Sequence, residues 1–430
     1  MKTYNYSDLS ASDIQSLVQR NVDPANEIRG IVEDIITKVK AHGDNALLDF
    51  ALKFDKVELE KLYLDKKELE VIASAVTAEQ SAALQIAYNN IHKFHAAQVK
   101  PEDKVETMPG VTCWREVRPI EKVGLYIPGG SAVLPSTFLM LGIPARIAGC
   151  HEIVVCSPPQ KNGKVNAFIA YVALLLGIDK IYLAGGAQAI AAMAYGTESI
   201  AKVDKIFGPG NQFVTKAKTI IQSTTATAID MPAGPSEVLV IADESCNPAY
   251  VAADLLAQAE HGIDSQAILV CISSKIADEV LTEIAQQVPV LPRAEIVKQA
   301  LANSDSVITT TLDEAMHFSN AYAPEHLILS TASWELQTAS IINAGSVFLG
   351  NLTPESAGDY ASGTNHTLPT SAYSRAYSGV SVDSFVKKIT FQHITPDGIK
   401  NIGPGVEILA ELEGLHAHKN AVSVRLKVKT

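Results

Sequence analysis

Residues 123–127 (VGLYI) begin a series of short apolar runs that decides the fold. Similar runs follow at 153–156 (IVVC), 181–184 (IYLA) and 204–207 (DKIF), and the spacing leaves room for one helix between neighbours. Continuous apolar runs that alternate with helical stretches are typical of βαβ units, in which a parallel sheet is buried on both faces. The sequence therefore predicts a parallel α/β unit in this part of the chain.

A second series of strand-like runs follows the Gly- and Pro-rich segment at 230–237 (DMPAGPSE), and helical stretches such as residues 248–259 separate its members. The runs lie at 238–242, 267–272, 307–310, 327–330 and 345–349. We therefore expect an α/β fold with two tandem Rossmann-like units, each built on a parallel sheet.

Smaller elements are expected toward both ends of the chain. The first 120 residues are helical in pattern, for example at 82–97. Residues 380–430 have the pattern of a strand (FVKKITFQ), a helix at 406–415 and a closing strand (AVSVRLKV). The segment 352–377 is rich in Gly, Ser, Thr and Pro, and irregular segments of this length are usually functional or disordered. Because it contains Asp, Glu and His, we favour a functional role.

The composition excludes several classes of protein. The 430 residues favour two to three domains, and 35 basic against 47 acidic residues give a net charge of −12. An acidic surface repels phosphate backbones, so we expect no nucleic-acid partner. Apolar stretches such as 167–178 are shorter than the roughly 20 residues that span a bilayer, and the polar N-terminus is unlike a signal peptide. We expect a cytoplasmic protein without a membrane segment.

The five cysteines are an odd number, and no two have the C-x-x-C spacing of a metal or redox motif. They are Cys113, Cys150, Cys156, Cys246 and Cys271. The pattern fits neither a disulfide framework nor a thiolate metal cage, so we expect reduced and mostly buried thiols. Neither Cys113 nor Cys150 has an obvious partner in sequence that would lower its pKa, and we predict that neither is a nucleophile.

Nitrogen and oxygen ligands for a metal ion occur in three places. Gln258 and His261 are three residues apart at the end of a helical run, so both side chains project from one helical face. Asp359 lies in the irregular segment, and the spacing does not choose between His416 and His418 near the C-terminus. A carboxylate and an imidazole would complete the ligand set of a catalytic zinc ion. The alternatives are an Asx turn at Asp359 and solvent-exposed histidines.

Glu325 and His326 are a candidate acid–base pair. They follow a proline and immediately precede an apolar strand, so they lie at a sheet edge, where the ligand crevices of α/β proteins commonly open. Adjacent acid and base side chains suit proton transfer. The alternative is a Glu-His pair with a purely structural role.

Three glycine-rich stretches follow predicted strands, namely LYIPGGSAVLPS, AGGAQAIAAMAYG and FGPGNQ. Their main-chain amides could approach a phosphate closely. None has the G-x-G-x-x-G spacing of a dinucleotide site, so these turns indicate a nucleotide only weakly. Tight strand-to-helix connections are the alternative.

A set of longer motifs extends over nearly the whole chain. In order, they are VGLYIPGGSAVLPS, GGAQAIAAMAYGT, DKIFGPGN, DMPAGPSEVLVIAD, DLLAQAEHG, PEHL, AGSVFLG, ESAGDYASGTNH and AHKNAV. Together they resemble the histidinol dehydrogenase family. The resemblance implies an NAD-dependent, zinc-containing enzyme that oxidises L-histidinol to L-histidine in two steps, through L-histidinaldehyde, as the last step of histidine biosynthesis.

The resemblance also implies roles for individual residues. It implies one zinc ion per subunit, and the ligands are Gln258, His261, Asp359 and His418. It assigns catalysis to Glu325 and His326. The implied substrate contacts are the four zinc ligands and, in addition, His326, Ser236 and Glu413. The implied NAD contacts are Tyr126, Gln188 and Asn211. Under this hypothesis His326 is the general base of both oxidations, and Glu325 activates the water that adds to the aldehyde.

The same resemblance implies a homodimer in which each chain has four parts. The parts are a small N-terminal segment (1–23), a substrate- and metal-binding α/β domain (24–125 with 236–380), an NAD-binding α/β domain (126–235) and a small C-terminal domain (381–430). The last part is too small to hold a core alone, and we expect it to complete the active site of the partner subunit. The competing hypotheses are a zinc hydrolase or lyase without NAD and a metal- or nucleotide-sensing protein without turnover.

Overall fold

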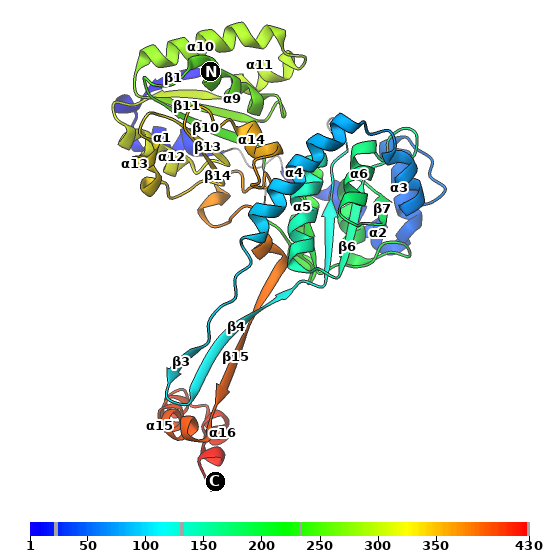
Figure 1. Ribbon diagram of the computed structural model, residues 1–430, viewed down its shortest axis with the longest axis vertical. Helices are drawn as coiled ribbons and strands as arrows, with labels where there is room; N and C mark the ends of the chain where they lie inside the picture. The colour runs from blue at the N-terminus through cyan, green and yellow to red at the C-terminus, as the bar shows by residue number, and fades with distance from the viewer. Residues whose placement is uncertain (21–24, 130–132, 233, 428–430) are drawn as a thin grey trace.

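The computed structural model describes residues 1–20, 25–129, 133–232 and 234–427. Two α/β units lie side by side, and a long stalk extends away from them to a pair of helices near the C-terminus (Figure 1). The predicted α/β fold with two units is confirmed. Among the described residues, no helix is both long and apolar enough to cross a membrane.

The first unit is built on a six-stranded sheet in which only the edge strand β2 is antiparallel to its neighbour. In spatial order the strands are β2 (Tyr63–Asp65), β7 (Lys180–Leu183), β6 (Glu152–Ser157), β5 (Lys122–Tyr126), β8 (Lys205–Phe207) and β9 (Ala228–Ile229). All four apolar runs predicted as strands in this region are confirmed.

Helices bury their apolar sides on both faces of this sheet. One face is covered by α2 (Ala25–Phe50), α7 (Gly186–Tyr195) and α8 (Gln212–Thr224). The other is covered by α3 (Lys66–Ala73), α4 (Ala78–Ala96), α5 (Pro135–Ala148) and α6 (Ala167–Leu175). Helix α2 is kinked at Gly43 and continues into a π-helical turn, η2 (Ala51–Asp55).

The second unit has a six-stranded sheet that is parallel throughout. Its strands are β1 (Lys2–Asn5), β12 (Asp305–Ile308), β11 (Gln266–Cys271), β10 (Glu237–Ala242), β13 (His326–Ser330) and β14 (Ser346–Leu349). One face packs against α9 (Pro248–Ala259), α10 (Ser274–Gln287) and α11 (Ala294–Ala302), and the other against α1 (Ala11–Val18) and α12 (Leu312–Tyr322). Two short helices, α13 (Trp334–Gln337) and α14 (Glu355–Tyr360), follow β13 and β14.

The two sheets share one strand order. Numbered from the central strand, β5–β9 lie in the order 3-2-1-4-5, and so do β10–β14. This is the order of a dinucleotide-binding unit, in which ligands bind where the direction of strand addition reverses. In the first unit that point lies between β5 and β8, and in the second between β10 and β13.

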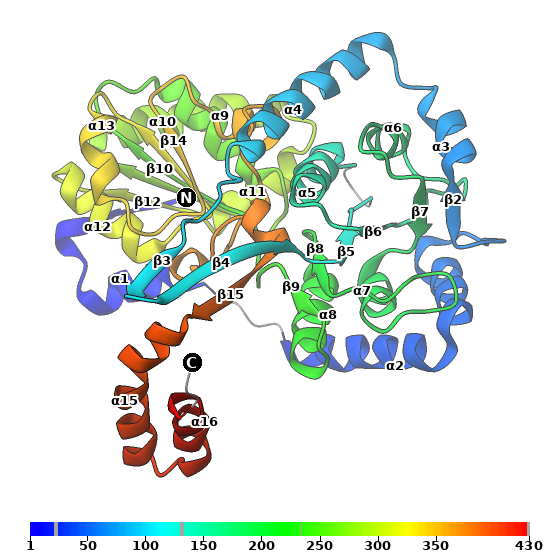
Figure 2. The ribbon, with the colours of Figure 1, turned by 60° about the horizontal axis from the view of Figure 1, so that its bottom comes forward.

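The stalk is a three-stranded antiparallel sheet of β3 (Val105–Met108), β4 (Val111–Pro119) and β15 (Val386–Ile394). It ends in the helices α15 (Pro396–Leu412) and α16 (His416–Leu426) (Figure 2). The predicted strand at FVKKITFQ is confirmed, but the predicted closing strand is wrong because that segment forms α16. Val422 and Leu426, four residues apart on one helical face, pack over Gly403 of α15.

The predicted domain boundaries differ from the structure in three ways. Residues 25–96, which were grouped with 236–380, supply β2 and α2–α4 of the first unit because their apolar faces cover its sheet. The N-terminal segment is part of the second unit, since β1 pairs with β12. Residues 381–430 are no separate domain, because β15 is hydrogen-bonded along its length to β4.

Candidate active site

A cavity of about 1020 Å³ lies between the two units. The first unit lines it with the residues that follow the carboxyl ends of its strands, including Pro128, Pro158 and Pro209. The second unit contributes the opposite edge, at the amino ends of β10 and β13. Glu325 and His326 thus lie at a sheet edge as predicted, but it is the amino edge and not the carboxyl edge at which ligand crevices of α/β units usually open.

The main chain of Glu237 holds both members of the predicted acid–base pair. Its amide donates to Oε2 of Glu325 (2.9 Å), and its carbonyl oxygen lies 3.0 Å from Nδ1 of His326. The pairing of β10 with β13 places Glu237 beside this pair, since Val238 is in register with His326. Both side chains are buried, so each has a fixed position at the cavity wall.

The hydrogen bond to Glu237 determines which nitrogen of His326 is free. A carbonyl oxygen is only an acceptor, so Nδ1 carries a proton and, in the neutral ring, Nε2 has the lone pair. Nε2 lies 3.5 Å from Oδ1 of Asp359 and has no hydrogen-bond partner in the described part of the chain. Burial lowers the pKa of His326, but the carboxylates of Glu355, Glu325 and Asp359 raise it well above its usual value. A cation bound among these carboxylates would offset their effect.

Glu325 can exchange a proton near neutral pH. Burial raises its pKa to about 7, although the charge of His326 and the amide of Glu237 act in the opposite direction. A carboxyl group with a pKa near the working pH is well suited to general acid–base catalysis. The position and the pKa of Glu325 therefore both fit a group that removes a proton from water.

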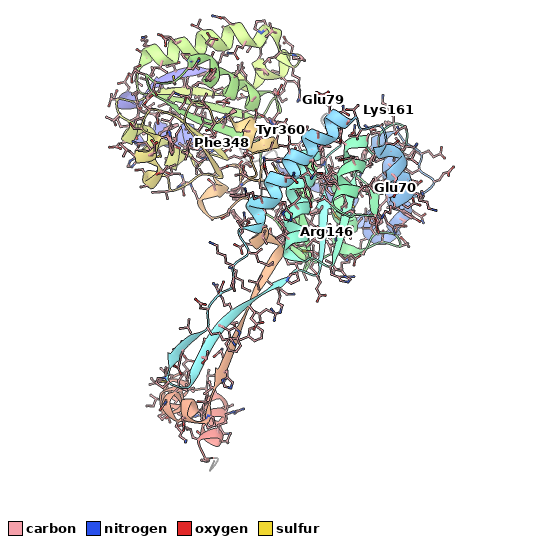
Figure 3. The ribbon with its side chains drawn as sticks, in the orientation of Figure 1. Glu70, Glu79, Arg146, Lys161, Phe348 and Tyr360 are labelled. Atoms are coloured by element: carbon pink, nitrogen blue, oxygen red, sulfur yellow. The ribbon has the colours of Figure 1, made fainter. Side chains whose placement is uncertain are left out.

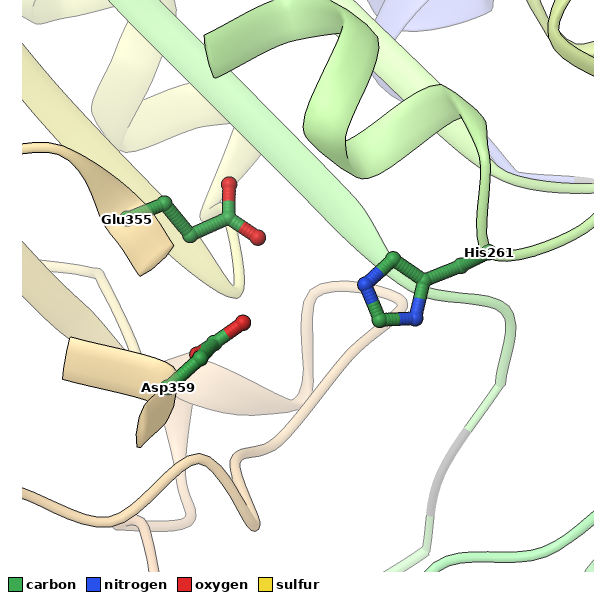
Figure 4. A group of neighbouring side chains, drawn as sticks. All are labelled: His261, Glu355 and Asp359. Carbon is green, nitrogen blue, oxygen red and sulfur yellow. The ribbon is translucent and has the colours of Figure 1, made fainter. Parts of the chain in front are cut away.

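His261, Glu355 and Asp359 form a group that could bind a metal ion. One ligand atom from each lies within 4.8 Å of the others, and Figure 4 shows the three side chains converging from two segments of the second unit. Glu355 and Asp359 lie on one face of α14, because they are four residues apart. The structure thus brings together two of the predicted ligands, His261 and Asp359, with a second carboxylate, Glu355, that the sequence did not predict.

Gln258, the third predicted ligand, also lines the cavity. Its side chain is fully buried, and neither Oε1 nor Nε2 has a hydrogen-bond partner in the described ranges. A buried amide without partners is costly, and a metal ion bound by Oε1 would satisfy the oxygen. The mixed nitrogen and oxygen donors of Gln258, His261 and Asp359 therefore fit a catalytic zinc ion with an open position.

His418 and Glu413 lie far from this cavity within the same chain. Glu413 caps the end of α15 and His418 lies in the first turn of α16, at the tip of the stalk (Figure 1). Both are exposed, as is His416. The single chain therefore does not place the fourth predicted ligand beside the other three.

The first unit lines the opposite wall with Tyr126, Gln188 and Asn211, the three predicted cofactor contacts. The hydroxyl oxygen of Tyr126 accepts a hydrogen bond from the amide of Gly186, and Asn211 caps the first turn of α8. The first turns of α7 and α8 both reach the cavity, and the positive end of a helix dipole favours phosphate groups. This wall fits a dinucleotide without the usual glycine spacing.

Ser236, a predicted substrate contact, also lines the cavity.

Sequence reasoning did not predict Glu355, a member of the candidate metal group, or His366, which lines the cavity. His366 hydrogen-bonds through Nε2 to the hydroxyl of Thr137 in the first unit. Both missed residues lie in the irregular segment 352–377 that we expected to be functional, and the four-residue spacing from Glu355 to Asp359 was the available signal. Tyr360, from the same segment, lies on the side of the second unit that faces the first (Figure 3).

Comparison with known proteins identifies the family. The family model for histidinol dehydrogenase matches residues 18–426. The chain belongs to the histidinol dehydrogenase family. A histidinol dehydrogenase from Bacteroides fragilis is 55% identical over 427 residues, covering 99% of both chains. The chloroplastic histidinol dehydrogenase of Arabidopsis thaliana is 52% identical over 99% of this chain and 92% of its own.

Solved structures agree with this assignment to the histidinol dehydrogenases. The crystal structure of histidinol dehydrogenase from Elizabethkingia anophelis superposes with a TM-score of 0.96 at 54% identity, covering 99% of this chain and 98% of its own. The resemblance seen in the motifs is confirmed. The chain is an oxidoreductase of the histidinol dehydrogenase family, which acts in the final oxidation of histidine biosynthesis.

Proposed function

We propose that this enzyme oxidises L-histidinol to L-histidine through L-histidinaldehyde, with NAD as oxidant and one zinc ion per subunit. The observation that carries the proposal is the two-sided cavity. One wall presents the base His326 with the donors Gln258, His261 and Asp359, and the other presents the strand ends and helix N-termini of a dinucleotide-binding unit. Two NAD molecules, bound one after the other on that second wall, would each accept one hydride.

The residues of the second unit account for the proton transfers. Nε2 of His326 takes the proton of the alcohol as the first hydride leaves its carbon. Glu325 removes a proton from water as its oxygen adds to the aldehyde, and the protonated His326 returns its proton to the resulting alkoxide to give the hydrate. His326 then takes a proton from the hydrate as the second hydride leaves, and the product is a carboxylate. This route needs no covalent bond to the enzyme.

Substrate orientation is the role we propose for the metal site. A bound zinc ion supplies a Lewis-acidic anchor for the imidazole and amine nitrogens of histidinol. Gln258, His261 and Asp359 would hold it, with His418 as the fourth ligand. Such anchoring would position the reacting carbon beside His326 and would exclude alcohols that lack the two nitrogens.

We further propose a homodimer in which His418 and Glu413 complete the partner's site. The end of the stalk leaves large apolar side chains exposed, among them Ile408, Leu409 and Leu412 of α15. Apolar groups gathered in this way are typical of an interface. A second copy would cover them and would bring the exposed His418 to a cavity that lacks a ligand. We place the enzyme in the cytoplasm, as expected from its sequence.

The proposed reaction is tested by following NADH absorbance with histidinol, before and after chelation of the metal. We expect two NADH per histidinol and loss of turnover on chelation, with recovery on adding zinc. Absence of NADH formation in the zinc-loaded protein would favour a hydrolase, a lyase or a sensing protein instead.

A further inference from the structure

One part of the cavity wall has no role in the chemistry described above. It is formed by Ile31 and Ile35 of α2 and by Phe54 and Asp55 of η2, all in the first unit. Ile31 and Phe54 are about half exposed, so their apolar surface is accessible from the cavity. The wall therefore offers apolar surface together with a single carboxylate.

The carboxylate of Asp55 lacks a partner. Its Oδ2 atom is buried and has no hydrogen-bond partner among the described residues. Burial raises its pKa to about 6. A buried acceptor without a donor is costly, so a ligand that donates hydrogen bonds would relieve this cost. Asp55 lines the same cavity as Tyr126, the last residue of strand β5; burial, together with the charge of Asp55, raises the pKa of Tyr126.

The usual acidic residue of a dinucleotide-binding unit is missing from its expected position. In such units an Asp or Glu after the second strand accepts hydrogen bonds from the ribose hydroxyls of the adenosine. The second strand here is β6, and it is followed by Pro158 and Pro159, both of which line the cavity. Asp55 supplies a carboxylate to the same cavity from outside the βαβ unit.

The position of the reacting groups indicates where each half of the bound NAD lies in the cavity. The nicotinamide ring has to meet the substrate beside His326 and Asp359, which belong to the second unit. The adenosine half is therefore left to the part of the cavity that the first unit lines. Ile31 and Phe54 can pack against an adenine ring there, and Asp55 is the carboxylate beside them.

We propose that Asp55 accepts hydrogen bonds from the adenosine ribose of the dinucleotide and selects NAD over NADP. This inference rests on the proposed function. A carboxylate accepts from a free 2′-hydroxyl, whereas it repels the 2′-phosphate of NADP in a site where solvent is partly excluded. The selectivity thus comes from one charge on the cavity wall.

The test is a comparison of NADH and NADPH binding by nicotinamide fluorescence in the zinc-loaded enzyme. Asp55→Asn should weaken NADH binding about tenfold, the effect of losing a hydrogen bond to a charged group, and should narrow the NADH to NADPH affinity ratio at least tenfold. Asp49→Asn is the matched control, because it removes the same charge from an exposed position on α2. It should leave both affinities unchanged.

Two further measurements distinguish the possible failures. A merely structural role for Asp55 predicts a lower unfolding temperature for Asp55→Asn without a change in the affinity ratio, and that result would overturn the proposal. In the unsubstituted enzyme, ADP-ribose should displace NADH at least tenfold better than 2′-phospho-ADP-ribose; equal displacement overturns it even if the variant does not fold. If the unsubstituted enzyme binds neither NADH nor NADPH, the proposed function itself fails, and this inference with it.

Discussion

The Nδ1 atom of His326 lies 3.0 Å from the main-chain carbonyl oxygen of Glu237. A main-chain acceptor cannot be removed by changing a side chain, so the ring orientation is fixed by the pairing of two parallel strands. In the neutral ring the lone pair is consequently on Nε2, the atom that we propose as the proton acceptor. Because Glu325 and His326 have different proposed roles, substitutions of the two residues should affect the alcohol and aldehyde oxidations differently.

Glu325→Gln should impair the oxidation of histidinaldehyde more than that of histidinol, because the amide keeps the shape but cannot take a proton from water. His326→Asn should slow both half-reactions by about 10²- to 10⁴-fold. Single-turnover experiments that start from each substrate provide the comparison. Glu335→Gln, at an exposed position on α13, is the control. Equal losses in the two half-reactions for Glu325→Gln would remove its special role.

The same carboxyl group predicts a pH dependence of the aldehyde step. Burial raises the pKa of Glu325 to about 7, and only the ionised form can act as a base. The rate of the aldehyde half-reaction should therefore fall as the pH is lowered through about 7. In Glu325→Gln the residual rate should lose this inflection; an unchanged profile would assign the titration to another group.

His261→Ala should lower the zinc content and abolish turnover, whereas His317→Ala, at an exposed position on α12, should do neither. A site of nitrogen and oxygen ligands without thiolates should lose its metal to a chelator while the fold persists. Metal analysis and circular dichroism check the two parts. Full zinc occupancy in His261→Ala would show that the ligand set is wrong.

Activity should return when inactive His326→Ala and His418→Ala chains are dissociated, mixed and reassembled. Each mixed dimer would contain one site built only from unsubstituted parts, so about half of the mixed dimers' sites should be active. His416→Ala is the control for His418→Ala, since both residues lie in the first turn of α16 and are exposed. Mixed dimers without any activity would place His418 in the site of its own chain.

Gly208→Ala should destabilise the enzyme and weaken NADH binding. The φ of Gly208 is +126°, and a Cβ atom there would lie 2.1 Å from the carbonyl oxygen of Tyr126. The strained backbone alone costs about 1–3 kcal/mol. Gly149→Ala, with φ +82° and no atom within 4 Å of the added Cβ, should cost about 1 kcal/mol and leave NADH binding intact. Urea unfolding and NADH titration measure both effects.

Cys113→Ser and Cys150→Ser should retain most of the aldehyde half-reaction. Burial raises the pKa of Cys150 to about 11, Cys113 lies on strand β4 of the stalk, and neither belongs to the residues that line the cavity. A thioester trapped on either residue during turnover would overturn the hydrate route.

The sequence predicted the strands well because each one is a continuous apolar run between helices, as at 238–242 and 267–272. It did not predict which sheet each helix covers. The helical spacing of the apolar residues in α2 would allow it to cover either sheet. Its packing against α7 and α8 places it on the sheet of the first unit. Of the stalk strands only β15 was predicted, and β4 was missed because it is only partly buried, so its alternation of apolar and polar residues is weak.

Within the site, Glu325, His326 and His261 were candidates from sequence because they stand at the ends of predicted elements, and Asp359 was a candidate because it lies in the irregular segment 352–377. Glu355 could not be separated from other acidic residues, since what distinguishes it is burial. Its side chain is 1% exposed, and burial raises its pKa to about 8. The unpaired Oδ2 of Asp55 is likewise a property of three-dimensional packing.

The pairing of β1 with β12 makes the second unit dependent on the order of synthesis. Lys2 is in register with Asp305, about 300 residues later, and the segment that forms most of the first unit lies between them. At about 5–20 residues per second, a ribosome takes roughly 15–60 s to produce the partner of β1. The first unit can thus fold before β12 has been synthesised. The pairing of β1 with β12, which completes the sheet of the second unit, should be a late and slow step in folding.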